Sequence, residues 1–143
     1  MAHLATPLQP ALAQRNLAPV RLWLPRFTLS HCVRAVVSRS TVGLGRHWSP
    51  EQRHNHFPAS PLCTISWFFA GHSDWLPPDG PPQRVPQVSF AGPFTQPSHS
   101  RNSEEGHGMM LMLLPDALQA LMGLDPARFL NRLVPLDEAL GPE

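Results

Sequence analysis

Apolar and polar side chains alternate most regularly between Leu62 and Ala70. Cys63, Ile65, Trp67 and Phe69 form one uniformly apolar face of this segment, and the intervening residues form a mixed face. A period of two predicts a β-strand whose apolar face is turned to the interior of the domain. We therefore expect Ile65, Trp67 and Phe69 to point inward, either as packed core or as the lining of a ligand cavity.

Three further segments have the character of strands. Phe27–Val42 is rich in β-branched residues and predicts one or two strands, and Met109–Leu114 predicts a short buried strand. Val85–Phe94 alternates as well, but Pro86 has no N–H to donate to a ladder, so an edge strand is expected there. The remaining connections are polar or rich in proline and are expected to be loops: Arg46–Pro61, Gly71–Arg84 and Gln96–His107.

The periodicity changes to that of helices after Leu114. Leu114, Ala117, Leu118, Leu121 and Met122 are spaced to form one apolar stripe, which predicts a helix between a proline and a glycine, Pro115 and Gly123. Asp125 is a natural N-cap for a second helix, and a third short turn is expected from Pro135. The predicted fold class is mainly β with two or three short C-terminal helices.

Composition supports short elements in a single domain. The chain has 143 residues, of which 18 are proline and nine are glycine, and this proline content excludes long helices over most of its length. The apolar runs are shorter than the ~20 residues of a membrane span, so no membrane segment and a cytoplasmic location are expected. Cys32 and Cys63 have no metal-binding spacing and are expected to be free thiols, with a single disulfide as the alternative.

Charge is distributed unevenly along the chain. Residues 1–50 carry six arginines and no acid, whereas residues 51–143 carry five arginines and ten acids, so that +6 and −5 sum to +1. A basic N-terminus can be a nucleic-acid arm or a targeting peptide. We favour a poorly ordered leader over residues 1–26, followed by one folded domain over residues 27–143.

His54-Asn55-His56 is a candidate metal motif, because alternate residues of a strand point to the same side. His99 is a candidate for a distant third ligand. No glutamate follows the pair, in contrast to metal-binding β-barrels of the cupin kind, and solvent-exposed loop histidines are the favoured interpretation. No cofactor is therefore expected.

The two predicted C-terminal helices have the outline of a helix-turn-helix. Arg128, Asn131 and Arg132 would then be the residues that contact DNA. The second helix is short, however, and its prominent Phe129 and Leu130 are apolar. Acidic residues nearby also weaken phosphate binding, so a structural cap on the β-domain is favoured over a DNA-reading pair.

Nucleophilic and acid–base catalysis have little support in the sequence. The chain has no Gly-x-Ser-x-Gly motif, and both cysteines lie in apolar, strand-like settings. The pair Glu104-Glu105 lies in a polar segment and is interpreted as solvated charge. We expect a non-enzymatic protein.

Five ordered blocks of this sequence form a characteristic set. They are His31–Thr41 (HCVRAVVSRST), Phe57–Gly71 (FPASPLCTISWFFAG), Val88–Pro97 (VSFAGPFTQP), Met112–Gly123 (MLLPDALQALMG) and Leu133–Gly141 (LVPLDEALG). Together they resemble the N-terminal domain of bacterial AraC-family transcriptional regulators, and the similarity extends from about Phe27 to Gly141.

The resemblance implies a cupin-like antiparallel barrel or jelly roll that senses a ligand or mediates dimerisation. It also implies a homodimer, a small-molecule effector, and DNA contact only through a separate C-terminal domain with two helix-turn-helix units. The chain stops where that domain is expected to begin, which suggests a fragment, a truncated product or a free-standing sensor domain. The resemblance does not assign effector-binding residues.

Overall fold

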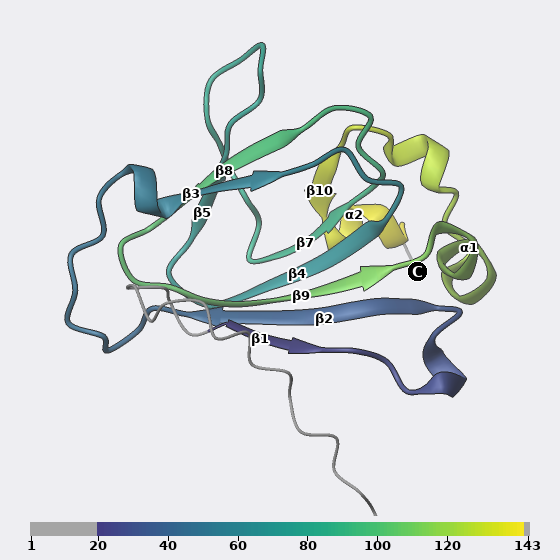
Figure 1. Cartoon of the computed structure of the whole chain (residues 1–143). Coiled ribbons are helices and arrows are strands. Elements are labelled where there is room, and N and C mark those ends of the chain that lie inside the picture. Colours follow the sequence, from purple (N-terminus) through teal and green to yellow (C-terminus); the bar gives the residue numbers. More distant parts are fainter. Residues whose placement is uncertain (1–19, 142–143) are drawn as a thin grey trace, which may run out of the picture.

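The larger of two β-sheets organises the molecule. A computed structural model of the chain describes residues 20–141, which form two antiparallel sheets stacked as a sandwich (Figure 1). Within these residues the larger sheet has six strands in the order β1-β2-β9-β4-β7-β10. Their bounds are β1 Val20–Trp23, β2 Val33–Ser40, β4 Cys63–Ala70, β7 Val88–Ala91, β9 His107–Leu113 and β10 Leu133–Pro135.

The smaller sheet covers one face of the larger one and lies above it in Figure 1. Within residues 20–141 it has four strands in the order β3-β8-β5-β6. Their bounds are β3 His54–Phe57, β5 Ser73–Trp75, β6 Gln83–Arg84 and β8 Ser98–Asn102. The predicted fold class, mainly β and antiparallel with short C-terminal helices, is confirmed, and the strands are arranged in two separate sheets.

Both α-helices within residues 20–141 follow β9, as the sequence predicts. The α-helices are α1 Pro115–Met122 and α2 Leu136–Leu140, and three 3₁₀ turns are η1 Phe27–Leu29, η2 Glu51–Arg53 and η3 Pro126–Phe129. Helix α1 begins at Pro115 and ends at Gly123, which takes the left-handed conformation with φ of 65°. None of the helices within residues 20–141 has the length and apolar character needed to cross a membrane.

The apolar core lies on the outer side of the larger sheet. Strand β4 is central, and its Ile65 is paired with Leu111 of β9 and Phe90 of β7. These side chains pack beneath α1, η3 and α2, which together form a cap on this side of the sheet. We call this surface the packed face; its buried members are Cys63, Ile65, Phe90, Leu113 and Val134, covered by Leu118, Leu124, Phe129 and Ala139 of the cap.

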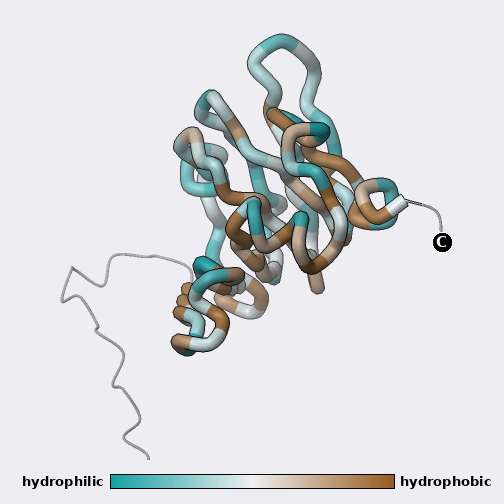
Figure 2. The backbone as a smooth tube through the Cα atoms, turned by 90° about the vertical axis from the view of Figure 1, so that its right-hand side faces the viewer, coloured by the Kyte–Doolittle hydropathy of each residue, from teal (hydrophilic) through white to brown (hydrophobic). Residues whose placement is uncertain are grey.

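The opposite side of the same strands faces the smaller sheet. We call it the pocket face; it carries Thr64, Ser66, Ser89, Met110 and Met112. Figure 2 shows the apolar segments running through the middle of the molecule and the cap, while the loop that projects between β5 and β6 is polar. The alternation of β4 therefore sends Cys63 and Ile65 toward the cap and Thr64 and Ser66 toward the sandwich interior.

Two strand predictions need correction. Strand β7 is not an edge strand, because it lies between β4 and β10. Pro86 precedes the strand, so its missing N–H removes nothing from the ladder. Strand β10 was predicted as part of a second helix, but only the four-residue turn η3 is helical there. Leu133 and Val134 instead extend the sheet beside β7.

The segments predicted as loops contain the whole smaller sheet. Strands β3, β5, β6 and β8 lie in Arg46–Pro61, Gly71–Arg84 and Gln96–His107. Their sequences are polar because one side of this sheet faces solvent and the other faces a pocket that is itself partly polar. Neither side carries the continuous apolar row by which strands are recognised in sequence.

The predicted leader of residues 1–26 is described only from Val20 onward, and residues 1–19 lie outside the described part of the chain. Val20–Trp23 is strand β1 and pairs with Val36–Arg39 of β2. The prediction of a poorly ordered leader is therefore wrong for this strand. The strand is hard to recognise in the sequence, because only five residues lie between Pro19 and Pro25 and four of them form β1.

Candidate functional site: a pocket between the two sheets

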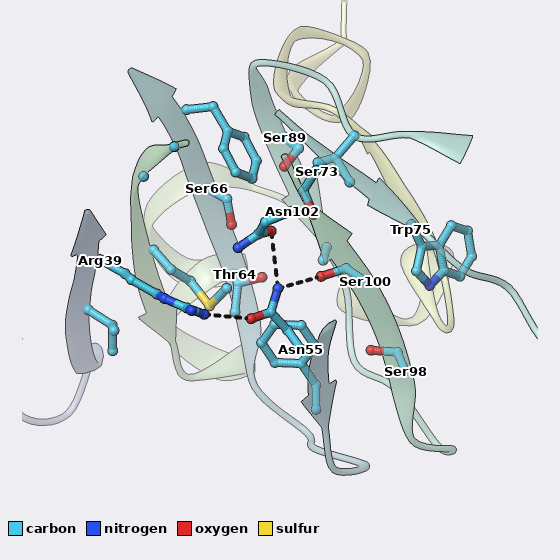
Figure 3. A pocket seen from close by; sticks show the side chains of 18 of the residues that line it. Arg39, Asn55, Thr64, Ser66, Ser73, Trp75, Ser89, Ser98, Ser100 and Asn102 are labelled. Carbon is cyan, nitrogen blue, oxygen red and sulfur yellow. Dashed lines mark hydrogen bonds between the residues drawn. The ribbon is translucent and has the colours of Figure 1, made fainter. Parts of the chain in front are cut away.

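A pocket of about 560 Å³ lies between the pocket face and the smaller sheet. Figure 3 shows side chains from both sheets pointing into it, among them Ser66 of β4, Asn55 of β3 and Ser100 of β8. Such a volume is in the range of roughly 300–1,000 Å³ that is typical of small-molecule sites.

The pocket exists because small residues occupy central positions of the pocket face. Ser66 of β4 is paired with Ser89 of β7, so two hydroxymethyl groups stand where large core residues would fill the space. Gly108 of β9 lies opposite Arg39 of β2 and offers no side chain at all. Larger apolar side chains complete the lining, which also includes Val37, Trp48, Phe57, Leu62, Phe68, Phe94, Met110, Met112 and Leu133.

A network of hydrogen bonds spans the pocket around Asn55. Its Oδ1 accepts a hydrogen bond of 3.0 Å from Nη1 of Arg39, which joins the smaller sheet to the larger one. Its Nδ2 donates to Oγ of Ser100 and to Oδ1 of Asn102, both at 3.1 Å (Figure 3). Three of the hydrogen-bonding positions of this side chain are therefore used, which fixes its orientation in the pocket wall.

The lining carries more positive than negative charge. Arg39 and Arg53 both border the pocket, whereas Glu104, which is exposed, is the one acidic residue among the lining residues of the described chain. Within residues 20–141, neither arginine forms an ion pair with a carboxylate. Arg84, Arg101 and Arg132 do form ion pairs, and none of these three residues lines the pocket.

Three buried N–H groups in the wall have no acceptor within the described residues. They are Nε1 of Trp48, Nε of Arg53 and Nε1 of Trp75, and all three residues line the pocket. A buried donor without a partner costs about 1–3 kcal/mol. Each of these nitrogens is covered by neighbouring atoms. The wall thus contains three donors that have no acceptor within the described residues.

Of the two alternatives for Ile65, Trp67 and Phe69, packed core and cavity lining, neither holds for all three residues. Ile65 is 6% exposed and belongs to the packed face, beneath the cap. Phe69 is 57% exposed and lies outside this pocket. Trp67 borders the pocket and also packs against the core. The alternation was interpreted correctly, but the cap covers the apolar face and leaves the mixed face to the pocket.

The histidine motif is on the outer side of the smaller sheet. His56 of β3 is paired with His99 of β8, and their Nδ1 atoms are 2.8 Å apart, so one ring donates and the other accepts. The ring centroids of His54 and His56 are 6.4 Å apart. Among residues 20–141, no three His, Cys, Asp or Glu side chains form a group that could hold a metal ion. Asn55 lies between the two histidines on β3, so its side chain points to the opposite side of the sheet and lines the pocket.

The candidate DNA-contacting residues serve the cap. Asn131, in the left-handed conformation with φ of 55°, accepts a hydrogen bond of 2.8 Å from the backbone N–H of Thr95. The guanidinium of Arg132 lies 5.7 Å from the centroid of the Phe129 ring and 3.5 Å from Glu138. Arg128 is exposed at the end of η3, whose four residues do not make a recognition helix. This arrangement agrees with the favoured structural cap.

The two cysteines are both free thiols, so the alternative of a disulfide is not realised. Cys63 is fully buried on the packed face, and this burial raises the pKa of its thiol to about 11. Such a thiol is neutral at physiological pH and behaves as a small apolar side chain. It is not placed to act as a nucleophile.

Sequence reasoning missed most of the pocket residues. Asn55, Ser100 and Asn102 lie in segments predicted to be loops, where polar residues carry no signal. A signal was available in β4, whose mixed face of Thr64, Ser66 and Phe68 is the one that borders the pocket. Arg39 within a β-branched strand was a second signal, because an arginine facing inward there needs a partner.

Searches for similar proteins gave no relationship from which to infer an activity. No protein-family model, no curated protein and no solved structure matches this chain at the significance applied.

Proposed function

We propose that this chain is a non-enzymatic, ligand-sensing domain of the AraC type, and that its effector is a small molecule bound in the pocket between the two sheets. The observation that carries the proposal is the pocket itself. It combines a volume of about 560 Å³ with large apolar side chains in its lining and a fixed polar group, Asn55, at its wall. An apolar cavity with a few convergent polar groups is the usual form of a small-molecule site.

The arrangement of β4 supports a sensing role. Ser66 faces the pocket and the adjacent Ile65 lies under the cap, so one strand contributes to both surfaces. A ligand that contacts the pocket face would favour those states of the strand in which the cap is also well packed. In this proposal the effector acts by shifting populations between cap arrangements.

Self-association is the second part of the proposal, with a second copy of this chain as the partner. Strand β1 forms one edge of the larger sheet, and the residues around it expose large apolar side chains. These are Val20, Leu22, Trp23, Leu24, Phe27 and Leu29, with exposed fractions between 48% and 93%. Antiparallel pairing of two β1 edges about a two-fold axis would cover them symmetrically.

Binding in the pocket is tested with N-phenylnaphthylamine, an uncharged apolar fluorophore. Titration of the full chain should give a saturable increase in fluorescence. Ser66→Trp places a large ring at the centre of the pocket and should weaken binding about tenfold or more, equivalent to at least ~1.4 kcal/mol. Phe69→Trp introduces the same residue on the same strand outside this pocket and should leave the affinity unchanged. Equal affinities of all three proteins would refute the pocket as the site.

Self-association is tested by the solution mass of the full chain across a range of concentrations. A dimer is expected, and Leu22→Glu on β1 should convert it to a monomer. Leu121→Glu on α1 is the matched control, because Leu121 is exposed to a similar extent, 69% against 61%. A monomeric wild type, or dissociation by the control and not by Leu22→Glu, contradicts an interface at β1.

A further inference from the structure

We infer that the ligand of the pocket is an organic anion, with a carboxylate or a comparable acidic head and an apolar body. This inference rests on the proposed function, since it names the chemical class that the same pocket would take. Three features of the wall carry it: the arginine that reaches the pocket, the buried N–H groups that have no acceptor, and a lining that combines polar groups with large apolar side chains.

Arg39 is the central residue of the inference. It projects from β2 toward Asn55 (Figure 3). Its Nη1 is used by Asn55, and within residues 20–141 its guanidinium has no carboxylate partner. A guanidinium stays charged at any physiological pH. A half-buried cation without a counter-charge is costly, and an anionic ligand group would supply that charge.

The remaining polar groups favour the same ligand. Arg53 adds a second positive charge at the pocket. The buried N–H groups of Trp48, Arg53 and Trp75 are all donors, and within the described chain none has an acceptor. Two guanidinium groups against one exposed carboxylate in the lining of the described chain favour a ligand with anionic acceptor oxygens over a cationic ligand. Glu104 is exposed, so its charge is screened by solvent.

The apolar part of the lining favours an organic anion over an inorganic one. Met110 and Met112 of β9 project from the pocket face, and Phe57 and Leu133 border the pocket from the two sheets. Methionine side chains adapt to ligands of irregular shape. An inorganic ion such as phosphate would leave this surface uncovered. A carbon skeleton attached to the acidic head would cover it and contribute about 25 cal/mol per Å² of buried apolar area.

The test compares two fluorophores that share one aromatic body and differ in charge. Anilinonaphthalene sulfonate carries an anionic head, and N-phenylnaphthylamine carries none. The full chain should bind the sulfonate about tenfold more tightly or better, since a charge-assisted pair is worth at least ~1.4 kcal/mol. Ser66→Trp should weaken both probes, which locates them in the pocket.

Arg39→Gln should abolish the preference for the anion, measured as the ratio of the two affinities within the same variant. Glutamine keeps an N–H group that can donate to Asn55, so the network is retained. Arg34→Gln is the matched control, because Arg34 lies on the same strand, is exposed and does not line the pocket. Where Arg39→Gln does not fold, Arg39→Lys replaces it, and its preference for the anion should be reduced.

The outcomes separate this inference from the proposed function. Binding of the neutral probe in the pocket with no preference for the anion overturns the inference and leaves the pocket function standing. A preference for the anion that survives both Arg39→Gln and Arg39→Lys also overturns it. Affinities for both probes that Ser66→Trp does not change overturn the proposed function itself.

Discussion

The two faces of the larger sheet are built from the same strands, but one is packed against the cap and the other borders a pocket. On the packed face, Ile65 and Phe90 are 6% and 0% exposed and lie beneath the cap. On the pocket face, the adjacent Ser66 and Ser89 border an open space of about 560 Å³. The core of this domain is therefore outside the sandwich, between sheet and cap, and the interior of the sandwich is available to a ligand.

A small β-domain can keep a cavity between its sheets and still fold when its core lies elsewhere. A sandwich usually obtains its stability from the side chains that interdigitate between its sheets. Here the cap packs against one face of the larger sheet and supplies the core, so the pocket face of that sheet does not need to be filled by side chains. The smaller sheet is joined to the larger one partly by polar contacts, such as that between Arg39 and Asn55.

Truncation of an aromatic residue should lower the free energy of unfolding much more on the packed face than on the pocket face. Phe90→Ala removes a fully buried ring that packs edge-on against Phe129, and should lower the free energy of unfolding by about 3–5 kcal/mol. Phe68→Ala enlarges a space that is already open and should cost about 1 kcal/mol or less. Urea unfolding measures both, and equal losses would mean that the pocket is packed in solution.

The buried thiol of the packed face makes a prediction about alkaline pH. Burial raises the pKa of Cys63 to about 11, so in the unfolded chain, where a thiol has a pKa of roughly 8.5, it ionises first. Its stabilising contribution is complete below pH ~8.5 and is lost as the pH rises toward 11, a loss of about 3 kcal/mol by linkage.

The measurement is urea unfolding between pH 8 and pH 11 in the presence of a reductant. The chain suits it, because all eleven basic residues are arginine and tyrosine is absent, so few other groups titrate there. Cys63→Ala should remove most of the decline, and Cys32→Ala should keep it. A decline that is the same in wild type and Cys63→Ala would show that the thiol is not buried.

The smallest effect is expected in the polar network of the pocket. Asn55→Ala leaves Arg39, Ser100 and Asn102 without a shared partner and should lower the free energy of unfolding by about 1–3 kcal/mol. His56→Ala changes the adjacent, exposed residue of the same strand and should stay within about 0.5 kcal/mol. Thermal unfolding compares them. A neutral Asn55→Ala would mean that water replaces the network at no cost.

The sequence predicts some elements much better than others. Strand β4, strand β9 and helix α1 are found close to their predicted bounds, because each has one face buried against an apolar neighbour and so shows a clear period. Strands β3 and β8 were missed because they pair polar residues such as His56 and His99 on the solvent side. Strand β10 was missed because three residues are too few to show any period.

The candidate site was predicted less well than the fold. Its position depends on which face of β4 is covered by the cap, and that contact joins Ile65 to residues such as Leu118 and Phe129, more than fifty positions away. Arg39 and Asn55 come together only because β2 and β3 lie in different sheets that face each other.

The amino-acid sequence by itself determined that the chain is mainly β, that β4 has an apolar and a mixed face, and that a short helical unit follows β9. These features are local, since the period of a strand, the proline that opens α1 and the glycine that ends it act over a few residues. Only the tertiary structure decided which face is filled and which is hollow. That choice depends on the volumes of side chains brought together from distant segments: large apolar residues of the cap meet Ile65 and Phe90, while two serines meet on the other side and leave a pocket.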